Sequence, residues 1–132
     1  MRKLIFALLL VLATPAHGEP TPGDHIPAQF HGLRCGDPDQ PDLPYTRAHG
    51  TECPARSGEA QLSITADTVE STETRCKVLM TAYDKRAKEL RTTEVCWYTV
   101  NDSADTKNGS VMISRYSIRN GKLHVIDKAD AQ

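Results

Sequence analysis

The stretch SVMISRYSIRNGKLHVID, residues 110–127, decides how this 132-residue chain folds. The pair Asn120-Gly121 stands between two strand-like runs and supplies the two positive φ angles of a type I′ hairpin turn. A turn centred there places Ile118 opposite Leu123 and Tyr116 opposite Val125, with Met112 further along the same face. The other face carries polar and basic side chains: Arg115, Ser117, Arg119, Lys122 and His124. The stretch therefore predicts two antiparallel strands, each buried on one face.

Three upstream runs show the same strand-like character: QLSIT (61–65), RCKVLMTAY (75–83) and RTTEVCWYTV (91–100). If Cys76 lies opposite Cys96 across a hairpin with its loop near residues 84–88, the two sulfurs share one face. That face also collects Val78, Met80, Ala82 and Leu90, together with the polar Thr92 and Glu94. The chain is therefore predicted to be all-β, a small antiparallel barrel or sandwich built as a meander over residues 61–128.

The preceding segment, residues 19–60, has a different composition. Seven of the eight prolines lie between Pro20 and Pro54. Proline removes a backbone donor and restricts the residue before it, so helices and central strands are disfavoured. We expect an irregular Pro-rich segment, or short edge strands linked by turns, that belongs to one domain spanning residues 19–132.

The first 18 residues, MRKLIFALLLVLATPAHG, have the pattern of a secretory signal peptide. Arg2 and Lys3 form a positive start, an apolar run from Leu4 to Ala13 follows, and small residues close the segment. The apolar run is too short for a membrane anchor. We therefore predict export to the periplasm or beyond, with a mature chain that begins near Glu19 and keeps no membrane anchor.

Four cysteines in an exported chain indicate two disulfides, because an oxidising compartment lets them form and persist. Sequence alone allows three pairings. The strand register favours Cys76–Cys96, which leaves Cys35–Cys53 to tie down the Pro-rich segment. The other two pairings remain open at this point.

Charge argues against a nucleic-acid partner. The whole chain has a formal net charge of −1, and removal of residues 1–18 takes away two positive charges to give −3. A mildly acidic domain lacks the basic footprint of a general nucleic-acid binder.

Two short stretches resemble each other: HGLRC (31–35) and HGTEC (49–53). Together they offer two imidazoles and two thiols, a ligand set that suits zinc or copper: His31, Cys35, His49 and Cys53. Metal binding requires thiolates, whereas the predicted compartment favours a disulfide. A metal site is therefore the alternative here, and the predicted cofactor set is empty.

Several segments together resemble a group of small proteobacterial periplasmic β-domain proteins: IPAQFHG (26–32), GEAQLSITADTVESTETRCKV (58–78), VCWYTV (95–100) and RNGKLHVID (119–127). The resemblance implies a small barrel or sandwich and assigns no activity. A lipocalin-like opening would place tryptophan two residues after Gly32, where this chain has Arg34.

No nucleophile elbow, zinc-protease motif or phosphate-binding loop occurs in the chain, so we expect no catalytic activity. Two surfaces are candidates for binding. The predicted register places Trp97 near Arg75, the composition of a binding hot spot. The second is the basic strip Arg115, Arg119, Lys122 and His124, which suits an acidic partner or a phosphate-bearing surface. The sequence predicts a binding or inhibitory module for another periplasmic or extracellular macromolecule; a small-molecule or metal carrier is the alternative.

Overall fold

The structure is a computed structural model that describes residues 21–54, 60–98 and 109–130. Its elements are, in chain order, β1 (Thr21–Gly23), the 3₁₀ helix η1 (Ala28–Phe30), β2 (Gly32–Cys35), β3 (Thr46–Arg47), β4 (Gln61–Ile64), β5 (Thr68–Ser71), β6 (Thr74–Asp84), β7 (Glu89–Tyr98), β8 (Ser110–Arg119) and β9 (Lys122–Asp130). The predicted leader, residues 1–18, and the predicted mature start at Glu19 lie outside the described residues.

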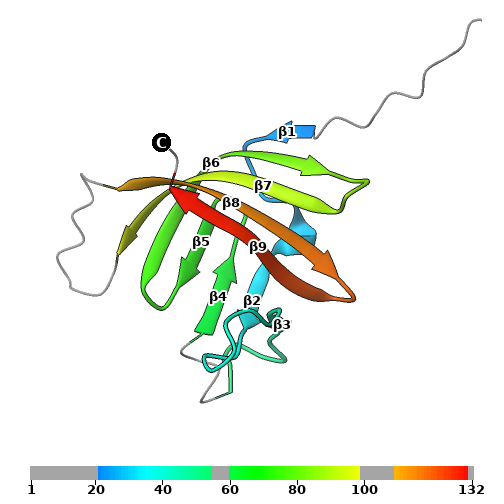
Figure 1. Cartoon of the computed structure of the whole chain (residues 1–132), viewed down its shortest axis with the longest axis vertical. Helices are drawn as coiled ribbons and strands as arrows, with labels where there is room; N and C mark the ends of the chain where they lie inside the picture. Colours follow the sequence, from blue (N-terminus) through cyan, green and yellow to red (C-terminus); the bar gives the residue numbers. More distant parts are fainter. Residues whose placement is uncertain (1–20, 55–59, 99–108, 131–132) are drawn as a thin grey trace, which may run out of the picture.

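The strands form one antiparallel sheet with the order β3-β2-β4-β5-β6-β7-β8-β9. The sheet curls until β9 returns to the segment before β3 (Figure 1). There the Tyr45 amide donates to the Leu123 carbonyl over 2.8 Å, and the Leu123 amide donates to the Tyr45 carbonyl over 2.9 Å. The prediction of an all-β fold is confirmed, in the form of a nearly closed barrel.

The β8–β9 hairpin has the predicted turn, and the predicted register holds from the turn to Tyr116, beyond which a β-bulge between Arg115 and Tyr116 shifts it. Asn120 and Gly121 adopt φ angles of 52° and 74°. Ile118 pairs with Leu123, and Tyr116 pairs with Val125. The expectation that Ser117 faces solvent is wrong: Ser117 is fully buried, and its hydroxyl oxygen accepts a hydrogen bond from Arg119 Nε at 3.3 Å.

The β6–β7 hairpin also has the predicted register at its cysteines, since Cys76 pairs directly with Cys96. A β-bulge between Val78 and Met80 then shifts the register. One extra residue reverses the faces beyond it, so that Thr81 is buried and Met80 is 58% exposed. The predicted inward position of Met80 is therefore wrong.

The Pro-rich segment takes the form of short strands joined by turns. β2 is more than an edge strand, because it pairs with β3 on one side and with β4 on the other. β1 pairs with the part of β6 that extends beyond β5. Both predicted disulfides are confirmed, Cys35–Cys53 and Cys76–Cys96.

One end of the barrel, here called the closed end, holds η1 and the turns at residues 65–67, 85–88 and 120–121. Ile26 and Phe30 are buried in the core at this end, and the Phe30 ring packs edge-on against Tyr83 with 5.8 Å between centroids. Arg34 Nη2 donates to the Gln29 carbonyl of η1 over 3.2 Å. The opposite end, here called the open end, contains the β5–β6 turn and the segment that follows β2.

Candidate binding site at the open end

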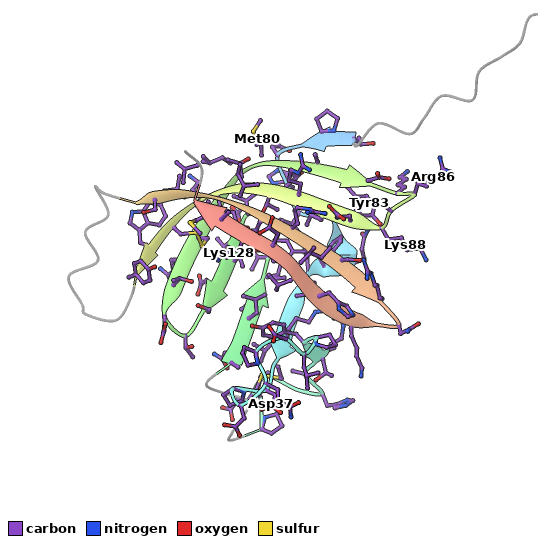
Figure 2. The ribbon with its side chains drawn as sticks, in the orientation of Figure 1. Asp37, Met80, Tyr83, Arg86, Lys88 and Lys128 are labelled. Atoms are coloured by element: carbon purple, nitrogen blue, oxygen red, sulfur yellow. A yellow bond between two sulfur atoms is a disulfide. The ribbon has the colours of Figure 1, made fainter. Side chains whose placement is uncertain are left out.

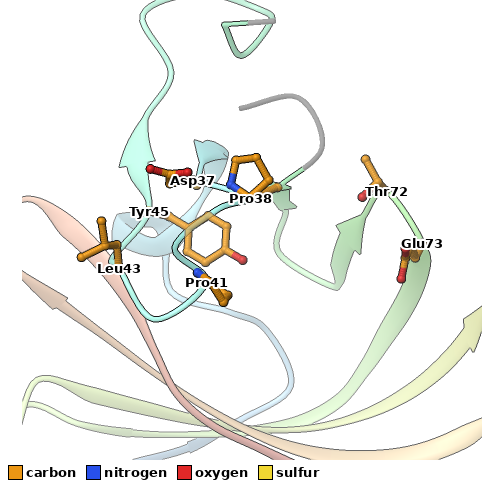
Figure 3. A pocket seen from close by; sticks show the side chains of 9 residues that line it. Asp37, Pro38, Pro41, Leu43, Tyr45, Thr72 and Glu73 are labelled. Atoms are coloured by element: carbon orange, nitrogen blue, oxygen red, sulfur yellow. The ribbon is translucent and has the colours of Figure 1, made fainter. Parts of the chain in front are cut away.

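The larger hollow at the open end has a volume of about 550 Å³. Figure 3 shows Tyr45 on one side of it, together with the prolines and Leu43 of the preceding segment, and Thr72 and Glu73 of the β5–β6 turn on the other side. The two backbone hydrogen bonds between Tyr45 and Leu123 fix the wall that this segment forms. The full lining is Gly36, Asp37, Pro38, Pro41, Leu43, Tyr45, Ala60, Thr72 and Glu73.

A second hollow of about 380 Å³ lies beside it and shares Glu73. Its walls come from the β5–β6 turn and from the open-end parts of β7, β8 and β9, with the lining Glu73, Thr74, Cys96, Trp97, Tyr98, Ser110, Met112 and Lys128. Tyr98 is 75% exposed at this rim. The hollow combines aromatic and thioether surface with one carboxylate and one ammonium group.

A buried carboxylate lies behind this second hollow. Glu94 on β7 is fully buried, and its Oε1 accepts hydrogen bonds from Thr92 Oγ1 at 2.6 Å and from Tyr116 Oη at 3.0 Å. Its Oε2 accepts a bond from Ser114 Oγ at 3.4 Å and lies 3.8 Å from Cys96 Sγ. Three hydroxyl donors offset part of the free-energy cost of removing the carboxylate from water.

Tyr116 keeps its proton in this setting. Burial, with the nearby Glu94 charge as the next cause, raises the pKa of the Tyr116 hydroxyl far above its usual value. The phenol therefore acts as a hydrogen-bond donor to Glu94 at any physiological pH.

The predicted Trp97–Arg75 pair is brought together, since the two residues are direct cross-strand partners. Arg75 also forms an ion pair with Glu70, whose Oε1 lies 3.1 Å from Arg75 Nε. Trp97 is half-buried and packs against the backbone of Gly109, where an added Cβ would lie 2.7 Å from indole atoms. Trp97 therefore both packs against Gly109 and lines the second hollow.

The predicted basic strip is interrupted by acidic side chains. Arg115 Nε donates to Glu89 Oε1 over 2.6 Å, and this bond lowers the pKa of the Glu89 carboxyl. Asp127 pairs with Arg115 across β8 and β9. Lys122 pairs with Arg119, and His124 pairs with Ser117, at the closed end of the same hairpin. The positive charge of the strip is thus partly neutralised.

The two H-G-x-x-C stretches do not supply thiolates for a metal, because Cys35 and Cys53 are joined in a disulfide. His31 Nε2 lies 2.7 Å from the Ile26 carbonyl oxygen, which gives that imidazole a structural contact. His49 lines a hollow of about 390 Å³ beside the Cys35–Cys53 bridge. Among the described residues, the one group of three metal-ligating atoms within 4.8 Å of one another is Cys76, Glu94 and Cys96, which contains the other disulfide.

Trp97, which lines the second hollow, was among the predicted binding residues, but Glu73, Glu94 and Lys128 were not. Glu94 carried a signal, because the alternation placed it with Thr92 on the face of Cys96, where a charged residue is unusual. No sequence pattern marked Lys128 or Glu73 as site residues, because each becomes part of the site only through the curvature of the sheet.

Within the described residues, no helix has the length and apolar character needed to cross a membrane. Comparison with protein-family models, with curated proteins and with solved structures found no match to this chain.

Proposed function

We propose that this protein is an exported, non-catalytic binding protein that holds a small ligand at the open end of its barrel. The observation that carries the proposal is the pair of hollows, about 550 and 380 Å³, that meet at Glu73. Volumes of this order suit small-molecule sites, which combine apolar walls with a few polar groups. The predicted leader and the two disulfides support export.

The residues that line the two hollows indicate the kind of ligand that fits there. Leu43, Tyr45, Trp97, Tyr98 and Met112 offer apolar and aromatic surface. Glu73 and Lys128 offer one charge of each sign at the rim of the second hollow. A compact, partly apolar molecule with polar groups fits this arrangement. Binding is favoured over catalysis because the Glu94 carboxylate is fully buried and already accepts three hydrogen bonds.

Native mass spectrometry of the protein purified from its own host tests the proposal. We expect a bound mass that is lost when Met112→Trp fills the second hollow. Ile113→Trp is the matched control, because Ile113 is the next residue on β8 and is 39% exposed. A bare wild-type chain, or a bound mass that Met112→Trp leaves unchanged, contradicts the proposal.

A second candidate is a binding or inhibitory module for another periplasmic or extracellular macromolecule. The observation that favours it is Tyr98, which is 75% exposed beside Trp97 at the same rim. Exposed aromatic residues near an arginine are typical of binding hot spots. We expect a pull-down from periplasmic extract to recover a stoichiometric protein that Tyr98→Ala loses; recovery that is independent of Tyr98 contradicts this candidate.

A further inference from the structure

The Cys76–Cys96 disulfide lies where the second hollow meets the barrel interior. Cys96 lines the hollow and is 9% exposed, whereas Cys76 is completely buried. An incoming thiolate reaches a disulfide by attacking one sulfur in line with the S–S bond. The two residues therefore differ in access: Cys96 lines the hollow, and Cys76 supplies the sulfur that leaves.

The charges around the two sulfurs also favour Cys76 as the sulfur that leaves. Lys128 Nζ lies 3.9 Å from Cys76 Sγ, and Figure 2 shows Lys128 on β9 beside the yellow bond of this disulfide. Lys128 is the cross-strand partner of the buried Ser114, and its side chain, which is exposed, reaches Cys76 Sγ from the open end. An ammonium group at this distance stabilises a thiolate, and a more stable thiolate is a better leaving group.

Glu94 gives Cys96 the opposite environment. Its Oε2 lies 3.8 Å from Cys96 Sγ and accepts a hydrogen bond from Ser114. A carboxylate oxygen beside Cys96 favours a protonated thiol there over a thiolate. At the Cys35–Cys53 bridge, Cys53 is half-buried, and its Sγ lies 3.7 Å from the uncharged Arg34 carbonyl oxygen.

We propose that Cys76–Cys96 is an exchangeable disulfide that accepts a low-molecular-weight thiol onto Cys96. In the step, the thiolate of the incoming molecule forms a bond to Cys96 Sγ while the Cys76–Cys96 bond breaks. The electron pair of that bond stays on Cys76 as a thiolate, beside the Lys128 ammonium. The product is a mixed disulfide at Cys96 and a free Cys76, so no other oxidant or reductant takes part.

Reduced glutathione is the probe for this proposal. The oxidised full-length protein is incubated with it at neutral pH without denaturant, quenched with acid, alkylated and mapped by mass spectrometry. We expect the reaction of this disulfide to place the glutathione adduct on Cys96 and the alkyl group on Cys76. An adduct on Cys76, or equal amounts of adduct on Cys76 and Cys96, overturns the proposal.

Variants at Lys128 test the role of charge. Lys128→Gln is expected to slow adduct formation by roughly fivefold to tenfold, and Lys128→Arg to restore most of the rate, because a leaving thiolate is faster when a cation stabilises it. Lys122→Gln is the matched control, as an exposed lysine at the other end of β9. An unchanged rate in Lys128→Gln overturns the proposal, and circular dichroism of each variant verifies that the barrel is folded.

Discussion

Inside the barrel, Tyr116 Oη donates a 3.0 Å hydrogen bond to Glu94 Oε1 from the neighbouring strand β8. Both side chains are almost completely removed from water. The bond joins a permanently protonated phenol to a carboxylate with no salt bridge in the described residues. It is therefore the contact in the core whose loss has the clearest expected effect.

Tyr116→Phe removes one of the three donors to the buried carboxylate while it keeps the ring. We expect the free energy of unfolding to fall by about 1.5–3 kcal/mol, the usual range for a hydrogen bond to a buried charged group. Urea denaturation provides the measurement. Tyr98→Phe is the control and should change stability little, because Tyr98 is mostly exposed; equal effects of the two substitutions would contradict the prediction.

The hairpin turn needs a left-handed backbone conformation at Gly121, so a residue with a Cβ there should destabilise the fold. Its φ of 74° lies in the left-handed region, which an L-residue with a Cβ enters at a cost of roughly 1–2 kcal/mol. Gly121→Ala should lower the free energy of unfolding by about that amount. Gly50→Ala is the matched control, since an added Cβ there meets no atom within 4 Å. A neutral Gly121→Ala would show that the turn does not hold the register.

Gly109 supports Trp97, the single tryptophan of the chain. A Cβ at residue 109 would lie 2.5 Å from Val95 Cγ1 and 2.7 Å from the indole, so one of them must move. We expect Gly109→Ala to shift the fluorescence of Trp97 to longer wavelength and to destabilise the fold by about 1–3 kcal/mol. An emission spectrum identical to that of the wild type would mean that the indole does not pack on this glycine.

The Glu89–Arg115 ion pair predicts a dependence of stability on pH. The hydrogen bond from Arg115 lowers the pKa of Glu89 in the folded state below its usual value. The stabilisation is therefore complete above the usual glutamate pKa and is lost as the pH falls through the lowered, folded-state pKa. The melting-temperature difference between wild type and Glu89→Gln should shrink from pH 7 to pH 3.

Both groups of that pair are partly exposed, so solvent screens the interaction and the difference should be small. The control is Glu52→Gln, an exposed glutamate on the segment before Cys53. A melting-temperature difference for Glu89→Gln that stays constant between pH 7 and pH 3 would contradict the assignment.

The sequence predicted those parts of the fold that depend on local pattern. Asn120-Gly121 fixed one register, and the cysteine spacing with strand alternation fixed the other. The bulge after Val78 was not predictable, because Leu79 and Met80 are both apolar and hide the shift of phase in the alternating pattern. The open-end hollow was not predictable either, since Glu73, Trp97 and Lys128 meet only after the sheet has curled.

The pairing of Tyr45 with Leu123 has a consequence for the order of folding. It joins a residue just before β3 to one in the last strand, and the chain between them contains β3 to β8. The entropy of closing so long a loop is recovered only after the intervening hairpins have formed. The wall of the open end therefore assembles only after the last strand is available, so a chain that still lacks β9 has no complete binding site.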